Sequence, residues 1–308
     1  MSVVIVSDYG GRSAEDWRYL RDTLDALGRQ RFGGRVELIL VDSTPDGETM
    51  PPELVDLVAS LRVLRGPKSA ACRLLNEAAR SAAADLIALL DGDCAPAPDW
   101  LEAAVAAMRT RPEAAVVSGV TRYPDAGFTH RVLSLLSRSF LDPGRAGATR
   151  FVSSNNAIFR RDALLAHPLG HPPRALASRL QTEAIRLGGG ALYFEPRMRV
   201  THRFEGWPME RRIRRNVGYR AVRIRQLDPR IPHAWMIRLG PAAIPLLLAG
   251  RLVESWWNCL RAGRRYGVRW YELPAALATA VGVHLMEIGG MRAAFNEGRT
   301  GPARNGPS

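Results

Sequence analysis

The sequence predicts an α/β fold in which a mostly parallel sheet is flanked by helices, and three observations support this. Short apolar runs rich in β-branched residues recur along the first third of the chain. Segments with apolar residues at helical spacing lie between most of these runs. One run ends directly in two aspartates, in the segment DLIALLDGDC of residues 85–94. Strands that alternate with helices form parallel sheets covered on both faces. Ligands of such sheets bind beyond the carboxyl ends of the strands.

The apolar runs give the predicted strands, which in chain order are 3–6, 36–41, 61–64, 86–90 and 115–120. The segments between them give the predicted helices, which are 17–27, 53–59, 70–84 and 100–108. At residues 98–102 the run PDWLE predicts a helix start, with Asp99 as N-cap and Glu102 closing a capping box. Further strands are expected at 151–159 and 191–194, with a loop rich in His and Pro and then a helix between them.

Composition and cysteine usage predict an ordinary globular chain. Hydrophobic residues make up 46% and charged residues 24% of the 308 positions, which excludes a disordered protein. The three cysteines, Cys72, Cys94 and Cys259, lack CxxC spacing, so neither a disulfide framework nor a zinc site is expected. The chain enters an apolar, strand-like run at residue 3 without a basic region before it, so no signal peptide is predicted.

The net charge of +13 is concentrated in the last third of the chain. From residue 197 onward there are 20 arginines against 7 acidic residues, whereas the preceding part is balanced at 23 and 23. Such a segment indicates an anionic partner: a membrane surface, a pyrophosphate or a nucleic acid. The alternative is a solvated basic surface in an arginine-biased protein, because Lys68 is the only lysine.

The sequence predicts two parts, an α/β domain over residues 1–228 and a C-terminal helical segment over 229–308. The apolar stretch 239–250 is too short to cross ~30 Å of hydrocarbon, which takes about 20 residues. The stretch 273–291 contains His284 and Glu287, which are costly at the centre of a bilayer. With tryptophans between them, the two stretches are typical of interfacial or re-entrant segments. The alternative is a pair of buried helices in a soluble lobe.

The two aspartates at the end of the fourth predicted strand are candidate metal ligands. Asp91 and Asp93 supply hard oxygen ligands suited to Mg2+ or Mn2+. Such an ion can hold a diphosphate and stabilise it as a leaving group. An isolated Asp-Gly-Asp is also common in turns, so the interpretation depends on the surrounding motifs.

Five motifs occur in a fixed order along the chain: VIVSDY at 4–9, ELILVDS at 37–43, RLLNEAARSAAADLIALLDGD at 73–93, SSNNAIFRRD at 153–162 and EPRMRVTH at 195–202. Together they resemble the inverting family 2 glycosyltransferases of GT-A fold, over roughly residues 3–225. The resemblance implies an enzyme that moves a sugar from a nucleotide-diphosphate sugar to an acceptor, assisted by a divalent cation.

The resemblance also implies roles for individual residues. The expected nucleotide contacts are Ser7 and Asp42 at the base, Asp91 at the ribose, and Lys68 and Arg73 nearby. Around the sugar and the metal it places Asn155, Asn156, Arg160, Arg161, Asp93 as direct metal ligand and His202 as ligand of the metal or diphosphate. Each has a plainer alternative: Asp42 caps a turn, Lys68 is a surface cation, and His202 is a core residue.

The general base is the point where the sequence departs from the family pattern. Relatives usually carry an acidic pair before the final helix, and one of its carboxylates deprotonates the acceptor. Residues 163–182 contain no acid here, and Glu183 follows later than that pattern would place it. Three explanations stay open: Glu183 acts through a shifted helix, His167 or His171 replaces it, or the acceptor is already an anion such as a polyprenyl phosphate.

The C-terminal part resembles that of the membrane-associated members of the family. The resemblance implies catalysis at the cytoplasmic face of the cell membrane, on a lipid-linked or envelope-polysaccharide acceptor. A catalytically degenerate protein that binds nucleotide sugar is one alternative. A haloacid-dehalogenase-like phosphatase is another, although that class usually carries Asp-x-Asp on its first strand. An oxidoreductase lacks its GxGxxG motif here, and no nucleic-acid recognition module is visible.

Overall fold

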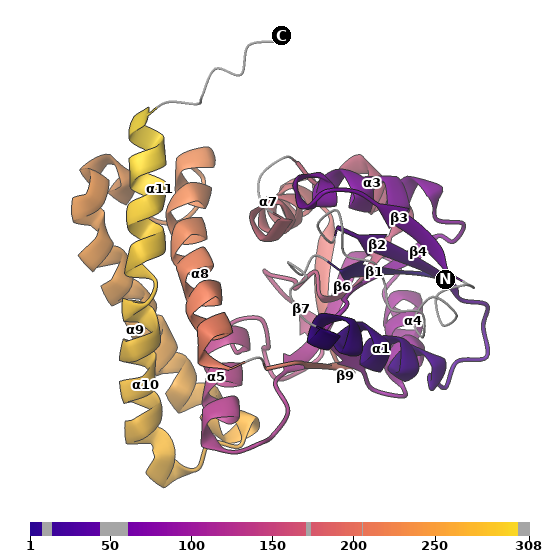
Figure 1. The fold of residues 1–308 in the computed structure, drawn as a ribbon, viewed down its shortest axis with the longest axis horizontal. Helices are drawn as coiled ribbons and strands as arrows, with labels where there is room; N and C mark the ends of the chain where they lie inside the picture. The colour runs from indigo at the N-terminus through magenta and orange to yellow at the C-terminus, as the bar shows by residue number, and fades with distance from the viewer. Residues whose placement is uncertain (8–13, 44–60, 171–173, 205, 301–308) are drawn as a thin grey trace. The chain divides into compact units, whose positions relative to one another are not determined.

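The computed structural model describes residues 1–7, 14–43, 61–170, 174–204 and 206–300. The chain folds into two compact units (Figure 1). The first, here called the sheet unit, comprises Met1–Pro124 and Phe140–Arg203. The second, called the helical unit, comprises Asp125–Ser139 and the chain from Phe204 onward. The helix predicted at 53–59 lies outside the described residues.

The sheet unit contains a nine-stranded mixed sheet, counted over the described residues, in the order β3-β2-β1-β4-β8-β6-β9-β5 with β7 paired to β9. Strands β1 to β4 pair in parallel. Strand β8 is antiparallel between β4 and β6, and β6 is parallel to β9. The bounds are β1 Ser2–Ser7, β2 Glu37–Asp42, β3 Arg62–Arg65, β4 Leu86–Asp91, β5 Cys94–Pro96, β6 Ala114–Arg122, β7 Gly147–Ala148, β8 Asn156–Arg160 and β9 Ala191–His202.

Helices cover both faces of this sheet, as the alternating pattern predicted. Helices α1 (Ala14–Gly28) and α4 (Trp100–Thr110) pack on one face, where Leu20, Leu24 and Trp100 belong to one apolar core. Helices α3 (Ala71–Ser81) and α7 (Arg174–Leu187) lie on the other (Figure 1). A 3₁₀ turn, η1 (Lys68–Ala70), precedes α3, and the short α6 (Arg161–Ala166) follows β8.

Two local predictions in the sheet unit are wrong. The strand expected from residue 151 begins only at Asn156. The side chain of Asp99 makes no capping hydrogen bond at the start of α4. Its carboxylate oxygens lie instead 3.3 Å from a guanidinium nitrogen of Arg199 on β9. A tertiary ion pair thus takes the side chain that the local PDWLE pattern assigned to the cap.

Strand β9 is longer than predicted and is kinked where it passes β6. The register shifts between Gly119 and Val120, opposite the β9 segment that contains Pro196. At this point the two strands approach so closely that a Cβ on Gly119 would lie 1.9 Å from the carbonyl oxygen of Met198. Only glycine fits there. Beyond the shift β9 continues to His202, which brings this residue to the sheet edge.

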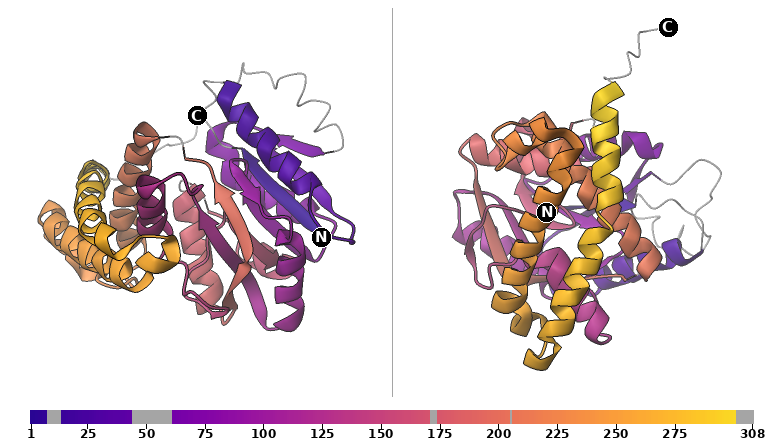
Figure 2. Two further views of the ribbon diagram at one scale, coloured as in Figure 1. Left: turned by 90° about the horizontal axis from the view of Figure 1, so that it is seen from below. Right: turned by 90° about the vertical axis from the view of Figure 1, so that its left-hand side faces the viewer.

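The helical unit consists of helices that run alongside one another (Figure 2). Its elements are α5 Phe128–Arg138, α8 Trp207–Leu227, η2 Ala234–Ala242, α9 Ala243–Ala262, η3 Gly263–Tyr266, η4 Trp270–Glu272, α10 Leu273–Leu285 and α11 Ile288–Thr300. Helices α8 and α11 touch through their backbones, because a Cβ on Gly290 would lie 1.8 Å from the carbonyl oxygen of Arg215. Their shared apolar core includes Val222 and Phe295.

The two units of the structure are not divided after residue 228, where the sequence predicted a boundary. Helix α8 belongs with the C-terminal helices because it packs against α11, and α5 joins the same unit. The boundary of the catalytic domain itself stays a prediction. The apolar stretch predicted over 273–291 is interrupted at Met286, between α10 and α11.

His284 and Glu287, which lie in the apolar stretch 273–291, are buried and paired with each other. Glu287 is fully buried, and its carboxylate accepts hydrogen bonds from Arg251 at 2.5 and 2.9 Å. Nδ1 of His284 lies 3.1 Å from the same carboxylate, and Nε2 lies 2.8 Å from the hydroxyl of Ser255. Paired groups inside a helical bundle are far less costly than isolated charges in lipid.

Two segments of the helical unit are long and apolar enough to cross a membrane, by length and composition only. They are Ala234–Tyr266 and Trp270–Glu297, and 17% and 33% of their most apolar windows are buried inside the unit. A core helix of a soluble protein would be mostly buried. The low buried shares are therefore compatible with an interfacial or membrane-associated segment.

Candidate functional site

The carboxyl ends of β1, β2 and β4 bring three predicted site residues to one edge of the sheet. In the parallel register Ser7 pairs with Asp42, and Val6 pairs with Asp91. Ser7 and Asp42 are each only 6% exposed. The carboxylate of Asp42 lies 3.5 Å from Nε of Arg65 on β3. The pattern of apolar runs followed by polar residues therefore located a real cluster.

The turn between the two aspartates is fastened to the neighbouring elements. Gly92 donates its backbone N–H to the carbonyl oxygen of Val6 at 2.8 Å. The hydroxyl of Thr23, on α1, donates to the carbonyl oxygen of Gly92 at 2.9 Å. A Cβ on Gly92 would lie 3.3 Å from that same Val6 oxygen, so the turn fits closely under β1. These contacts fix the position of Asp93 relative to the sheet edge.

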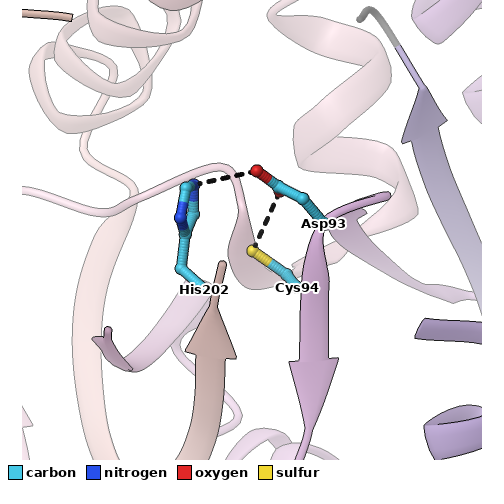
Figure 3. Close-up of side chains that lie close together, drawn as sticks. All are labelled: Asp93, Cys94 and His202. Carbon is cyan, nitrogen blue, oxygen red and sulfur yellow. Dashed lines mark hydrogen bonds and ion pairs between the residues drawn. The ribbon is translucent and has the colours of Figure 1, made fainter. Parts of the chain in front are cut away.

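Asp93 faces His202 across the short antiparallel pairing of β5 with β9 (Figure 3). Nε2 of His202 lies 3.3 Å from Oδ2 of Asp93. The next residue, Cys94, pairs directly with His202 in the strand register, and its Sγ lies 3.5 Å from Oδ1 of Asp93. Among the described residues, Asp93, Cys94 and His202 form the one group of three possible metal ligands whose ligand atoms lie within 4.8 Å of one another.

The tautomer of His202 follows from its second nitrogen. Nδ1 lies 2.7 Å from the carbonyl oxygen of Arg203, which can only accept, so Nδ1 carries the proton. The lone pair of Nε2 in the neutral ring then points toward Asp93. A backbone partner on one nitrogen that frees the other for a metal is the usual arrangement of histidine ligands. The edge of Tyr123 packs against the ring, with centroids 5.5 Å apart.

These residues fit the divalent cation that the sequence predicted, and ligation by Asp91 stays a prediction. A carboxylate oxygen and an imidazole nitrogen converge on one point, as Mn2+ and similar ions require. Asp91, predicted as a further ligand, does not belong to the group of converging atoms. It ends β4 beside β1, where the ribose contact remains a prediction.

The two asparagines of SSNN have different surroundings. Asn156 is fully buried, and its amide donates to the carbonyl oxygens of Val120 and Met198 at 2.9 and 3.0 Å. Its Oδ1 accepts from the indole N–H of Trp100 at 2.7 Å. Because every polar atom of this side chain is used inside the protein, the predicted contact with the donor sugar is wrong. Asn156 links β8 to β6, β9 and α4 through buried hydrogen bonds.

Asn155 instead lies beside the ligand group. Its Nδ2 is 3.8 Å from Sγ of Cys94. Its Oδ1 accepts hydrogen bonds from the hydroxyl groups of Ser153 at 2.5 Å and of Thr121 at 3.5 Å. The side chain is 5% exposed, so a direct contact with the donor stays a prediction. The structure places the Asn155 amide beside the thiol of Cys94.

A family model described as "Glycosyl transferase family 2" matches residues 4–166, which is more than half of the chain. The chain belongs to glycosyl transferase family 2. It is therefore a glycosyltransferase, and the predicted resemblance to family 2 is confirmed, with four of the five motifs inside the matched residues. A comparison with curated proteins gave no match.

Solved glycosyltransferases share the fold. The mannosyltransferase PcManGT from Pyrobaculum calidifontis, solved in complex with GDP-Man and Mn2+, superposes with a TM-score of 0.54 at 19% identity, over 96% of this chain and 84% of that one. S. aureus TarS 1–349 in complex with UDP gives 0.52 at 14% identity, over 99% and 92%. These likenesses support the predicted GT-A fold.

Most of the basic residues that the family pattern placed near the donor make contacts within the protein. Arg73 is exposed on α3 and lies 3.5 Å from the carboxylate of Glu77, one helical turn away. Arg160 donates to the carbonyl oxygens of Ala114 and Met108. Arg161 donates to the carbonyl oxygen of Arg80, so both side chains hydrogen-bond to backbone. Lys68 begins η1 ahead of α3, but its side chain lies outside the described part.

The candidate general bases lie on α7 and in the loop before it. Glu183, on α7, is paired with Arg186 one turn later, and its side chain is 12% exposed. His167 ends α6, and its carbonyl oxygen accepts from Gln181 of α7. His171 lies outside the described residues, and the identity of the base stays a prediction.

Sequence reasoning missed three residues that shape the site. For Cys94 the sequence predicted only that it belongs to no disulfide framework or zinc site, and neither Thr121 nor Thr23 was singled out. A local signal existed for Cys94, since it follows the second aspartate directly. Its neighbourhood with His202 depends on the β5–β9 pairing, which no short-range pattern reveals.

Proposed function

We propose that this glycosyltransferase moves a sugar from a nucleotide-diphosphate sugar to a lipid-linked or envelope-polysaccharide acceptor at the cytoplasmic face of the cell membrane, with inversion and with the help of Mg2+ or Mn2+. The observation that carries the proposal is the 3.3 Å approach of Asp93 Oδ2 and His202 Nε2. It occurs just after β4, whose end lies beside the Ser7–Asp42 pair.

In this proposal each part of the site has a separate task. Asp42 accepts a hydrogen bond from the nucleotide base, while Asp91 contacts the ribose. Asp93 and His202 hold the cation, which, when bound, neutralises the diphosphate and makes it a better leaving group. That PcManGT was solved with GDP-Man and Mn2+, and TarS with UDP, supports a nucleotide donor.

The acceptor attacks the anomeric carbon from the side opposite the diphosphate, which inverts that carbon. If the acceptor is a hydroxyl, its proton passes to a base in the transition state. Glu183, which is paired with Arg186, is the proposed base. If the acceptor is a lipid phosphate, the attacking oxygen is already an anion and no base is needed.

The membrane location rests on the surface of the helical unit. Its exposed apolar side chains on η2, α9 and η4 include Trp235, Leu239, Val253, Trp257, Leu260 and Trp270, between 47% and 83% exposed. Tryptophan is favoured at the level of lipid head groups. The chain from residue 197 onward also carries a net charge of +13. Each basic residue near an anionic leaflet contributes about 1 kcal/mol of attraction.

A nucleotide-binding experiment tests the enzyme proposal. Thermal unfolding of the full chain is followed with a panel of nucleotide sugars, with and without Mn2+. A ligand that binds only the folded state raises the melting temperature. The expected result is a rise for one donor that requires Mn2+ and is lost in Asp93→Ala. No Mn2+-dependent rise for any donor, or an undiminished rise in Asp93→Ala, contradicts the proposal.

A further inference from the structure

Cys94 stands beside the two proposed ligands of the cation, and nothing in the proposed reaction uses it. Its Sγ lies 3.5 Å from Asp93 Oδ1, and within 4.8 Å of the ligand atom of His202 (Figure 3). Cys94 and His202 come from the paired strands β5 and β9, and Asp93 lies in the turn directly before β5. Oxygen, nitrogen and sulfur thus converge on one small volume.

We propose that the Cys94 thiolate is a third ligand of the cation held by Asp93 and His202, so that the site prefers thiophilic ions such as Zn2+ and Co2+ over Mg2+. The inference rests on the proposed function only for the position of the cation. Thiolate ligands favour zinc-like ions, whereas sites made only of carboxylates and water suit Mg2+. One sulfur in the ligand set therefore changes which ion binds best.

Two distances between the side chains are close to those expected between ligands of one small ion. Metal–ligand bonds of about 2.0–2.1 Å for N and O and about 2.3 Å for S place an N–O pair about 3.3 Å apart and an S–O pair about 3.6 Å apart. The structure has 3.3 Å between His202 Nε2 and Asp93 Oδ2, and 3.5 Å between Cys94 Sγ and the other carboxylate oxygen, Oδ1, so each of the two Asp93 oxygens lies at ligand spacing from one of the other two side chains. Three protein ligands leave a fourth position open for a diphosphate oxygen or water.

The surroundings of Cys94 offer a polar partner to a sulfur ligand. The side chain is fully buried. A coordinated thiol loses its proton, which passes to solvent as the ion enters. The amide N–H of Asn155, 3.8 Å from Sγ, then donates toward the negative sulfur. Partners of this kind tune a metal ligand without touching the ion.

The competing explanation is that Cys94 is a small apolar residue of the core. It belongs to the same buried cluster as Trp100 and Met198, and buried cysteines commonly fill such positions. This explanation predicts no bond between sulfur and any bound ion. The absence of CxxC spacing, from which the sequence predicted no zinc site, does not separate the two explanations, because His202 comes from a distant part of the chain.

The test is a Co2+ titration of the purified full chain, followed by absorption spectroscopy. A bond from thiolate to Co2+ gives an intense charge-transfer band in the near ultraviolet. We expect this band in the wild type and its loss in Cys94→Ser. The double variant Cys72→Ser/Cys259→Ser is the control and should keep it. Burial raises the pKa of the Cys259 thiol to about 11, which makes it a poor thiolate in its own right.

A second measurement is the Zn2+ affinity, determined by competition with a chelating dye. Loss of a direct ligand should weaken it at least tenfold in Cys94→Ser, since removal of outer-shell partners alone costs about 10–100-fold. The absence of a charge-transfer band in the wild type overturns the proposal without any variant. So does a band that survives Cys94→Ser. In either case Mn2+-dependent nucleotide binding would persist, so this failure is distinguishable from failure of the proposed function.

Discussion

Replacement of Asn156 by alanine tests the role of this side chain in the core. The structure gives it three hydrogen bonds, from its amide to the carbonyl oxygens of Val120 and Met198 and to its Oδ1 from the indole of Trp100. In Asn156→Ala the buried indole N–H loses its acceptor, which costs about 1–3 kcal/mol. Each carbonyl loses one bond, worth about 1 kcal/mol. The total expected loss of stability is about 3–5 kcal/mol.

Trp100→Phe removes one of these bonds together with part of the buried indole ring, so it also leaves a small cavity. We expect a loss of about 1–2 kcal/mol from the unpaired Oδ1, to which the cavity adds its own cost. The two substitutions share that bond, so their effects should not add, and the double variant should be more stable than the sum predicts. A coupling near zero would mean that the indole and the amide do not interact.

The measurement must report on the sheet unit, because the chain has two compact units that can unfold separately. Hydrogen exchange of the backbone amides in β6, β8 and β9, read by mass spectrometry, gives the local free energy of opening. In Asn156→Ala we expect faster exchange there and unchanged donor affinity for the folded fraction. Unchanged exchange with a loss of donor binding would refute the structural role and restore the original prediction of a sugar contact.

Two further predictions concern the base and the membrane. Glu183→Gln should lower turnover at least about 100-fold without weakening donor binding, if the acceptor is a hydroxyl. Glu77→Gln, which breaks a similar ion pair on α3, is the control, and full turnover in Glu183→Gln eliminates Glu183 as base. The full chain should float with anionic vesicles, less so at high salt and in Trp257→Ser/Trp270→Ser. Equal flotation of the variant would contradict insertion of these side chains.

The sequence predicted the parallel half of the sheet well because its signal is local. Apolar runs of four to six residues that end in Asp42 or Asp91 mark buried strands and their carboxyl ends, and parallel pairing then aligns those ends. The pairing of β5 with β9 carries no such signal. Strand β5 spans only Cys94–Pro96, too short to show a period, and its partner lies far along the chain.

Asn156 shows why polar residues near a site are hard to interpret from sequence. A buried amide serves either a ligand or the protein's own backbone. Here the shift in register between Gly119 and Val120 interrupts the β6–β9 ladder, and the carbonyl oxygens at the interruption accept from Asn156. The need for an internal donor exists only because of that shift. A single sequence gives no sign of it, so the asparagine resembled a ligand contact.

The contacts that fix Asp93 also bear on which ion fits. The turn before it is held by Thr23 and by the backbone of Val6, and the N–H of Arg203 donates to the Asp93 carbonyl oxygen at 3.0 Å. Ligands held this firmly keep their spacing when an ion enters. Ca2+ takes about six to eight oxygen ligands, whereas this site offers an imidazole nitrogen 3.3 Å from a carboxylate oxygen. Donor type therefore disfavours Ca2+ here, and a sulfur ligand from Cys94, as proposed, would add to that preference.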